Sequence, residues 1–313
     1  MPIRQIGSLD VSLVGLGCNN FGGRTNEAQS TEVVRAALDA GINFFDTADV
    51  YGGTRSEEIL GAALGQDRAD VIVATKFGMT VSPERTGAAP KYVKSALEES
   101  LRRLGTDYVD LYQLHRPDPA TPIGETLAAL ADLVKAGKVR EIGCSNFSGA
   151  QLREAEVAAA DGAPRFVSVQ NQYSLLEREP ELEVLAECER LGTAFIPFSP
   201  LANGLLSGKY RRGEPPPPGT RLAGMPADRR QKLLAGPTMD IVEQLESFAR
   251  QQGRGLLELA IAWLAAKSVV ASVIAGATRA EQVSANVRAA DWVLTEEELQ
   301  AVDLIGAAPR PTG

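Results

Sequence analysis

Four ionisable side chains in the first part of the chain could together transfer a proton. Asp46 follows an apolar segment, Tyr51 lies five residues further on, and Lys76 and His115 each follow a later apolar segment. A buried lysine needs a counter-charge, and Asp46 is the nearest candidate. An ammonium group beside a phenol favours phenolate and lowers the phenol pKa from its ordinary value of about 10. We therefore expect Lys76 to make Tyr51 a better acid at neutral pH, with Asp46 keeping Lys76 charged.

His115 is the only histidine in the chain, and it could hydrogen-bond a carbonyl oxygen beside Tyr51. This set of groups suits reduction of a C=O bond, in which hydride reaches carbon and a proton reaches oxygen. Each residue also has a structural explanation. A lone histidine is more often structural, Lys76 and Asp46 could form a plain ion pair, and Tyr51 could be a surface aromatic residue. The choice depends on the elements that carry the four residues.

Short apolar segments alternate with amphipathic ones along nearly the whole chain. Parallel strands need crossover helices, so the alternation predicts parallel pairing. Eight such units favour a closed (β/α)8 TIM barrel, an α/β fold, over an open doubly wound sheet. The open sheet would usually carry G-x-G-x-x-G after its first strand, but Asn20 occupies the third glycine position. We expect strands at 14–17, 42–45, 71–75, 108–114, 139–143, 166–170, 194–197 and 270–274, and crossover helices at 30–40, 56–64, 90–104, 122–136, 149–160, 180–191 and 280–289.

Other segments are expected outside the alternating units, which we assign to one barrel domain over residues 1–313. Strands at 3–6 and 11–13 around a Gly7-Ser8 turn predict an N-terminal β-hairpin. Residues from about 201 to 237 are rich in Gly, Pro and Arg and predict a long loop, either a binding loop or a surface excursion. Additional helices near the C-terminus are expected at 238–252, 256–266 and 295–305, the last capped by Thr295 and Glu298.

Barrel enzymes place their chemistry at the carboxyl ends of the strands. A polar or ionisable residue follows seven of the eight apolar segments, and Asp46, Lys76 and His115 are among these residues. The predicted barrel would therefore bring the candidate proton-transfer residues to the same face of the molecule.

Several sequence blocks stand at the ends of the expected strands and in the loops that follow them: 41–52 (GINFFDTADVYG), 75–76 (TK), 110–115 (DLYQLH), 142–146 (IGCSN), 170–173 (QNQY) and 197–210 (PFSPLANGLLSGKY). These blocks resemble the aldo-keto reductase family and occur in the order typical of that family. The resemblance covers almost the whole chain. It implies direct hydride transfer from NADPH without a metal, with Tyr51 as general acid supported by Lys76, Asp46 and His115. It also implies a monomer or weak homo-oligomer.

Polar residues after the later strands are candidates for binding the nicotinamide. Ser145, Asn146 and Gln170 can donate and accept hydrogen bonds at a carboxamide, which needs both. Phe198 could stack on one face of the ring. The resemblance places a loop with Leu201, Gly204, Ser207 and Lys209 over the pyrophosphate. Ser199 and Gly276 are expected to contact the cofactor as well, and Arg221 is expected to add a second contact to the phosphate on the adenosine ribose.

A second phosphate site is expected where the last barrel helix begins. Thr278 and Glu281 form a capping-box pattern, and free N–H groups at a helix N-terminus bind phosphate. Arg279, Gln282 and Asn286 have helical spacing and would share one face. The resemblance places the adenosine ribose phosphate here with Arg279 as its clamp, which favours NADPH (NADP+) over NADH. Arg279 alone could equally be a solvated charge.

The substrate is expected to be a small-molecule aldehyde or ketone. Sugar-type reductases of the family carry a tryptophan just after the first strand, where this chain has Cys18-Asn19-Asn20-Phe21. Asn20 and Phe21 are therefore the candidates for lining the substrate pocket, and we expect a broad carbonyl substrate.

Composition excludes several other classes of protein. The chain has 313 residues, 44% of them hydrophobic, and a net charge of -8, which argues against nucleic acid and anionic membranes as partners. Its three cysteines are widely spaced, so neither a disulfide framework nor a zinc site is expected. The first residues do not resemble a signal peptide, and a cytoplasmic protein is expected.

Two competing functions remain at this point. A lyase could use Lys76 as a Schiff-base nucleophile, but this needs a neutral amine beside Asp46. A nucleotide-binding regulatory barrel with little turnover is the other, since relatives of that kind exist in the family that the chain resembles.

Overall fold

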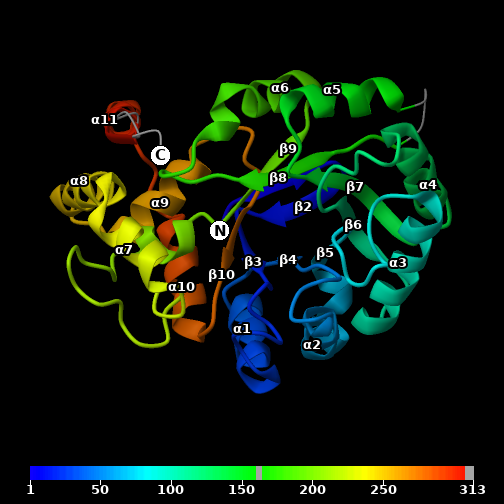
Figure 1. Ribbon diagram of the computed structural model, residues 1–313, viewed down its shortest axis with the longest axis horizontal. Coiled ribbons are helices and arrows are strands. Elements are labelled where there is room, and N and C mark those ends of the chain that lie inside the picture. Colours follow the sequence, from blue (N-terminus) through cyan, green and yellow to red (C-terminus); the bar gives the residue numbers. More distant parts are fainter. Residues whose placement is uncertain (160–163, 307–313) are drawn as a thin grey trace.

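Eight short strands pair in parallel into a closed barrel in the computed structural model, which describes residues 1–159 and 164–306 (Figure 1). The strands follow one another around the barrel in sequence order, and the last closes on the first by pairing Val273 with Val14. The predicted TIM barrel is confirmed. The strands are β3 (Val14–Gly17), β4 (Phe44–Asp46), β5 (Ile72–Phe77), β6 (Val109–Leu114), β7 (Val139–Ser145), β8 (Ser168–Gln172), β9 (Ala194–Phe198) and β10 (Val273–Gly276).

Amphipathic helices surround the barrel and supply its crossover connections (Figure 1). Helix α1 begins earlier than predicted because Asn26 and Gln29 form a capping box there. The predicted end of the fifth crossover helix, Ala160, lies outside the described residues. The crossover helices are α1 (Glu27–Asp39), α2 (Arg55–Leu64), α3 (Pro90–Leu104), α4 (Ile123–Lys135), α5 (Gly149–Ala158), α6 (Val184–Leu191) and α10 (Ala280–Ala289), with short 3-10 turns at η1 (Gly65–Asp70) and η2 (Glu179–Leu182).

The N-terminal hairpin packs against the inside of the barrel. Strands β1 (Ile3–Ile6) and β2 (Leu9–Ser12) pair antiparallel, as predicted. Three fully buried apolar residues of this hairpin join a cluster of inward-facing strand residues that includes Phe44 and Leu111. The interior of the barrel is therefore a packed core rather than a channel.

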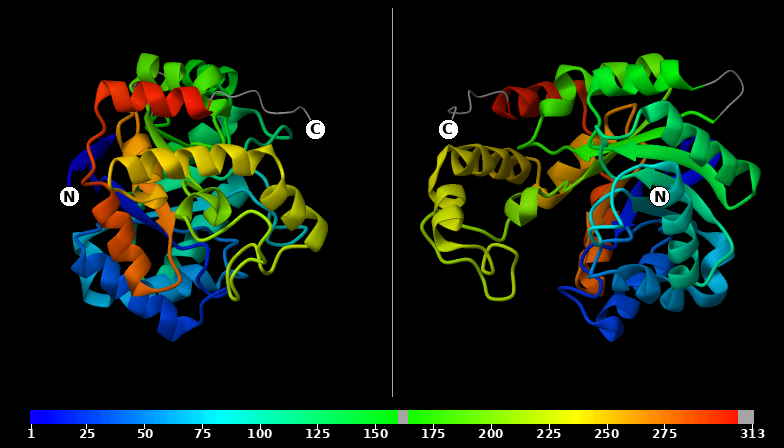
Figure 2. Two further views of the ribbon diagram at one scale, coloured as in Figure 1. Left: turned by 90° about the vertical axis from the view of Figure 1, so that its left-hand side faces the viewer. Right: turned by 45° about the vertical axis from the view of Figure 1, so that its right-hand side comes forward.

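The segment between β9 and β10 departs from the predicted long loop. It contains the 3-10 helix η3 (Ala202–Ser207) and helix α7 (Ala227–Ala235), which the frequent Gly and Pro residues concealed. Helices α8 (Pro237–Gln251) and α9 (Leu256–Ala265) follow, as expected. Figure 2 shows this yellow part of the chain at one side of the barrel.

The tail helix α11 (Glu296–Gly306) carries its predicted cap. The Glu298 N–H donates to Thr295 Oγ1 at 3.2 Å, and the Thr295 N–H donates to Glu298 Oε2 at 2.7 Å. The capping box read from the sequence is confirmed.

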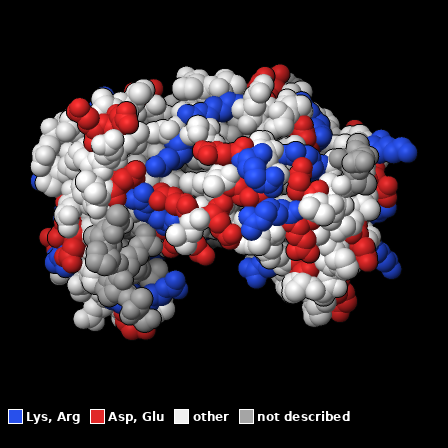
Figure 3. All heavy atoms as spheres, turned by 90° about the horizontal axis from the view of Figure 1, so that it is seen from above, with Lys and Arg blue, Asp and Glu red and all other residues white. Residues whose placement is uncertain are grey.

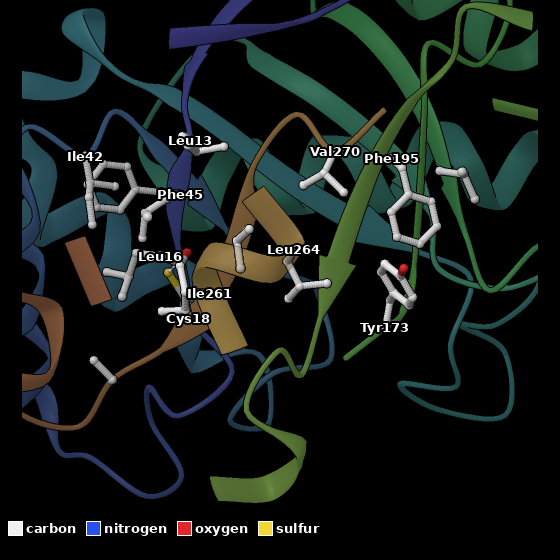
Figure 4. Close-up of a cluster of buried hydrophobic side chains, with 14 of the residues drawn as sticks. Leu13, Leu16, Cys18, Ile42, Phe45, Tyr173, Phe195, Ile261, Leu264 and Val270 are labelled. Carbon is white, nitrogen blue, oxygen red and sulfur yellow. Dashed lines mark hydrogen bonds between the residues drawn. The ribbon is translucent and has the colours of Figure 1, made fainter. Parts of the chain in front are cut away.

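A second apolar layer fills the space between the strands and the surrounding helices. Phe45 from β4, Phe195 from β9 and Leu264 from α9 belong to it (Figure 4). On the surface, basic and acidic side chains are interspersed on the face that Figure 3 shows. Among the described helices, none combines the length and apolar character that a bilayer crossing requires.

Candidate active site

Adjacent strand ends bring the four predicted proton-transfer residues together. Parallel pairing sets Asp46 of β4 opposite Ala74 of β5, two residues before Lys76. The Lys76 ammonium donates to Asp46 Oδ2 at 2.6 Å, to the Thr47 carbonyl at 2.8 Å and to the Tyr51 hydroxyl at 3.5 Å. Its side chain is fully buried and that of Asp46 is 3% exposed. The ion pair therefore lies directly behind the Tyr51 phenol.

The carboxylate of Asp46 is held from a second side by amide groups. Gln170 Nε2 donates to Asp46 Oδ1 at 2.8 Å, and Gln113 Nε2 donates to the same oxygen at 3.2 Å. Both glutamines are buried, Gln113 on β6 and Gln170 on β8, with β7 between these two strands. Gln113 was not selected from the sequence, although its place one residue before a strand end was a usable signal.

The loop that carries Tyr51 is fixed by a close backbone approach. Gly52 has φ +58°, and a Cβ atom at this position would lie 2.2 Å from the Phe21 carbonyl oxygen. Only glycine fits here. The Ser56 N–H donates to the Tyr51 carbonyl at 3.2 Å, which ties the loop to the start of α2. The Tyr51 ring meets the His115 ring edge to face, with centroids 5.7 Å apart.

Burial and charge set the protonation states of this cluster. Burial lowers the pKa of Lys76, but Asp46 and Tyr51 outweigh burial and raise that pKa above its ordinary value, so Lys76 stays an ammonium. Burial raises the pKa of Tyr51 and outweighs the opposing effect of Lys76. The predicted net lowering of the phenol pKa is therefore wrong for the protein alone, because the sequence revealed the cation but not the degree of burial.

His115 is neutral across the ordinary pH range. Burial lowers its pKa to about 3, and the charges of Lys76 and Arg116 act in the same direction. Its Nδ1 atom is buried and has no hydrogen-bond partner among the described residues. A neutral imidazole carries one N–H donor and one acceptor nitrogen. His115 can therefore contact a ligand oxygen without exchanging its own proton.

The cluster opens into a cavity of about 690 Å³ that extends from Tyr51 to the start of α10. Lys76 does not line it, since that side chain lies behind Tyr51 and Asp46. The predicted residues that line the cavity are Asn20, Asp46, Tyr51, His115, Ser145, Asn146, Gln170, Phe198, Ser199, Leu201, Gly204, Ser207, Lys209, Arg221, Gly276, Thr278, Arg279, Gln282 and Asn286.

Phe21 does not line the cavity. Its side chain is fully buried in the apolar layer beneath the helices, so its assignment to the substrate pocket is wrong. Phe21 precedes the glycine-rich turn 22–23, and burying its aromatic ring in the core stabilises the fold more than exposing the ring to a polar cavity would. Asn20, one residue earlier, does face the cavity, and its Oδ1 atom is buried without a hydrogen-bond partner among the described residues.

The polar residues proposed for a carboxamide form a connected group. Asn146 Nδ2 donates to the His115 carbonyl at 2.9 Å and to Ser145 Oγ at 3.1 Å, while Ser145 Oγ donates to the Gln170 carbonyl at 2.7 Å. Asn146 has a left-handed φ of 61°, as has Ser199 at 55°. Such conformations in residues other than glycine are strained and cluster at functional sites.

The start of α10 differs from the predicted capping box. Gln282 Oε1 accepts from the Thr278 N–H at 2.8 Å and from Thr278 Oγ1 at 3.2 Å, whereas Glu281 makes no such bond. The cap predicted from Thr278 and Glu281 is wrong because Gln282 reaches back to Thr278 instead. Arg279 is the N-cap residue and is exposed toward the cavity.

Cations dominate the charged residues of the cavity wall. Arg24, Lys209, Arg221 and Arg279 line it, and none of them forms an ion pair within the part of the chain that the structure describes. Arg24 donates to the Gly219 carbonyl at 3.0 Å, and Arg221 donates to Asn203 Oδ1 at 3.1 Å. Burial and the charge of Arg24 lower the pKa of Arg221.

Sequence reasoning missed Arg24, which lies on the loop after β3. Its position after Gly22-Gly23, close to the end of the first barrel strand, was the available signal. Among the described residues, Asp46 is the only acidic residue on the wall, and it is already paired with Lys76. The cavity of this acidic protein therefore favours an anionic ligand.

A barrel with ionisable residues gathered beside a cavity at its strand ends is the architecture of TIM-barrel enzymes. The model of the aldo/keto reductase family matches residues 13–307, and the chain belongs to that family. The chain is 36% identical over 317 residues to "Uncharacterized oxidoreductase YrpG" of Bacillus subtilis, covering 96% of this chain and 94% of that protein.

Two other relatives carry names of different kinds. "Probable voltage-gated potassium channel subunit beta" of Oryza sativa subsp. japonica is 36% identical over 293 residues, covering 91% of this chain and 89% of that protein. "L-glyceraldehyde 3-phosphate reductase" of Escherichia coli O157:H7 is 33% identical over 321 residues, covering 97% of this chain and 92% of that protein.

Proposed function

We propose that the chain is an NADPH-dependent reductase of aldehydes or ketones, with Tyr51 as the general acid. The observation that carries this proposal is the contact of the Tyr51 hydroxyl with a buried Lys76–Asp46 ion pair at the edge of a cationic cavity. A tyrosine that is only a surface residue would not need to contact a buried ion pair. An ion pair that is only structural would not need a tyrosine hydroxyl beside its ammonium group.

The chain's own residues account for the proton. Tyr51 has a proton to give at neutral pH, because the ordinary phenol pKa of about 10 already lies well above 7 and burial raises the pKa of Tyr51 further. The neutral His115 and the Tyr51 hydroxyl would both contact the carbonyl oxygen, which orients that oxygen for protonation. When the Tyr51 proton moves to that oxygen, a phenolate remains, and the Lys76 ammonium stabilises it.

The cavity residues fit a dinucleotide. A reduced nicotinamide supplies the hydride that the carbonyl carbon needs. Asn146 and Gln170 each have a side-chain carbonyl oxygen that accepts no hydrogen bond within the described residues. These two oxygens would accept hydrogen bonds from the NH2 group of the carboxamide. Lys209, Arg221 and Arg24 would hold the pyrophosphate, and Phe198 would pack against the ring.

We assign the preference for NADPH over NADH to Arg279. Its guanidinium lies at the N-terminus of α10 without an acidic partner among the described residues, where a phosphate would receive both the guanidinium and the free backbone N–H groups. Asn286, on the same face of α10, is buried at the cavity wall and would contact the adenosine.

A Schiff-base lyase is disfavoured by the state of Lys76. Its side chain is fully buried, its pKa is raised, and its ammonium makes three hydrogen bonds. A regulatory barrel that binds the nucleotide with little turnover remains the second candidate, because one relative is named as a potassium channel subunit beta. The two candidates differ in turnover and agree on nucleotide binding.

The test is a titration of the purified protein with NADPH and with NADH, followed by a carbonyl panel monitored by cofactor absorbance. The panel should include L-glyceraldehyde 3-phosphate, the compound in the name of one relative. We expect tighter NADPH binding and carbonyl-dependent loss of absorbance. Binding without turnover on any carbonyl would favour the regulatory barrel, and no nucleotide binding would contradict both.

A further inference from the structure

A buried carboxyl group lies beside the loop of Tyr51, and no step described above uses it. Asp49 is 1% exposed and does not line the cavity. Its Oδ1 atom has no hydrogen-bond partner among the described residues, and Oδ2 receives only a long bond of 3.4 Å from the Tyr92 hydroxyl. A buried carboxylate is normally paired or multiply hydrogen-bonded, so this site does not suit the charged form.

The elements around Asp49 do not supply a counter-charge. From α2, Glu57 adds a second, fully buried carboxylate. From α3, Arg103 is committed to Glu57 Oε2 at 2.7 Å and to Glu99 Oε2 at 3.3 Å. Arg85, from the loop before α3, is paired with Glu99. Within residues 1–159 and 164–306, no cation lies within ion-pair distance of Asp49.

The peptide group between Ala48 and Asp49 is hydrogen-bonded to two residues of the proton-transfer cluster. Its N–H donates to the Lys76 carbonyl at 3.1 Å. Two residues further on, the Tyr51 N–H donates to the Ala48 carbonyl at 3.2 Å. A displacement of Asp49 would therefore move the Tyr51 backbone relative to the end of β5, which carries Lys76.

We propose that Asp49 is a positioning residue for Tyr51 that acts in its neutral form. With a proton on its carboxyl group, Asp49 packs against α2 and α3 and holds residues 47–52 in the arrangement that sets Tyr51 against Lys76. Loss of that proton places an unpaired charge beside Glu57, and the segment shifts so that water reaches the carboxylate. The effect on turnover rests on the proposed reductase function, whereas the effect on the loop does not.

Asp49 titrates in a pH range that separates it from His115, Tyr51 and Lys76. Burial and the charge of Glu57 raise its pKa to about 7, while Arg103, the Tyr92 hydrogen bond and Arg85 act in the opposite direction. The pKa of His115 lies near 3, and those of Tyr51 and Lys76 lie above their ordinary values. A step in rate near neutral pH therefore reports Asp49 rather than these three groups.

The first experiment measures kcat, KM and the Kd for NADPH against pH in the wild type and in Asp49→Asn, which has the shape of the neutral acid. We expect the wild-type kcat to fall about tenfold between about pH 6 and about pH 8.5, with KM and Kd unchanged. Asp49→Asn should keep the higher value throughout. The exposed Asp132→Asn is the matched control and should retain the step. The same step in Asp49→Asn, or no step in the wild type, would overturn the proposal.

A second readout needs no substrate. Hydrogen exchange of the peptide over residues 48–56 reports the amides of Tyr51 and Ser56, which are both bonded within this loop. After correction for the intrinsic pH dependence, wild-type protection should fall above about pH 7 and that of Asp49→Asn should not. This difference without any turnover would uphold the loop movement and count against the reductase. Turnover with identical protection in both proteins would refute the positioning role and leave the reductase standing.

Discussion

Replacing Asp46 with asparagine removes the negative charge of the buried ion pair of the site while keeping the shape of the side chain. Asp46 Oδ2 accepts from Lys76, and Oδ1 accepts from Gln113 and Gln170. Asparagine offers one carbonyl oxygen and one NH2 group, so its NH2 must face either the ammonium or two other NH2 groups. Breaking one side of a buried pair costs roughly 3–5 kcal/mol because the partner charge remains buried.

Equilibrium urea unfolding followed by circular dichroism measures this loss. At about 1.4 kcal/mol per factor of ten, the expected change corresponds to roughly a hundredfold or more in the unfolding equilibrium constant, with an unchanged denaturant slope. Turnover should fall as well, because Lys76 would lose the carboxylate that keeps it charged.

The matched control for this change is Asp132→Asn. Asp132 pairs with Lys94 at the same 2.6 Å, but the two side chains are 64% and 47% exposed, so solvent screens the pair. We expect no measurable change in the control. Equal effects of the two substitutions would refute the conclusion that burial gives the Lys76–Asp46 pair its importance.

Three further outcomes are expected. Arg279→Ala should raise the Kd for NADPH about 10- to 100-fold and that for NADH much less, as measured by fluorescence titration at constant salt; equal losses would remove Arg279 from the phosphate site. Folding lowers the pKa of His115 from 6.5 to about 3. Between these two pH values the unfolded state binds a proton at His115 more readily than the folded state does, so the free energy of unfolding drops as pH falls from 6.5 toward 3. Urea unfolding of His115→Gln at about pH 7 and about pH 4.5 should show a smaller drop than the wild type, and an equal drop would contradict the buried neutral imidazole. Thr295→Ala should destabilise α11 by about 1 kcal/mol through loss of its cap, and unchanged exchange of the Glu298 amide would contradict this.

The barrel was predictable because each of its parts has a local signal. Apolar strands, amphipathic helices and the turn at Gly7 are set by residues near one another in the sequence, and parallel pairing follows from the crossover helices. The same holds for the cap formed by Thr295 and Glu298. Where two nearby side chains compete, the local signal fails, as at α10, where Gln282 rather than Glu281 reaches Thr278.

The sequence predicted which residues come together at the candidate site, but not the direction in which the pKa of Tyr51 shifts. Strand ends marked Asp46, Lys76 and His115, and the barrel brings them together as expected. The net direction of the Tyr51 pKa depends on burial by the whole fold, which outweighs the one cation that the sequence revealed. Asp49 gave no signal, because Glu57 becomes its neighbour only when α2 packs against the Tyr51 loop.

Tyr51→Phe is the most direct test, since it removes a single oxygen atom from the cluster. Kd for NADPH and kcat with an accepted aldehyde should be measured on the same preparation of the variant and of the wild type. The Kd should stay within about twofold, while kcat should fall by about a hundredfold or more, the range that general-acid catalysis contributes. Near wild-type turnover in this variant would mean that another group protonates the carbonyl oxygen.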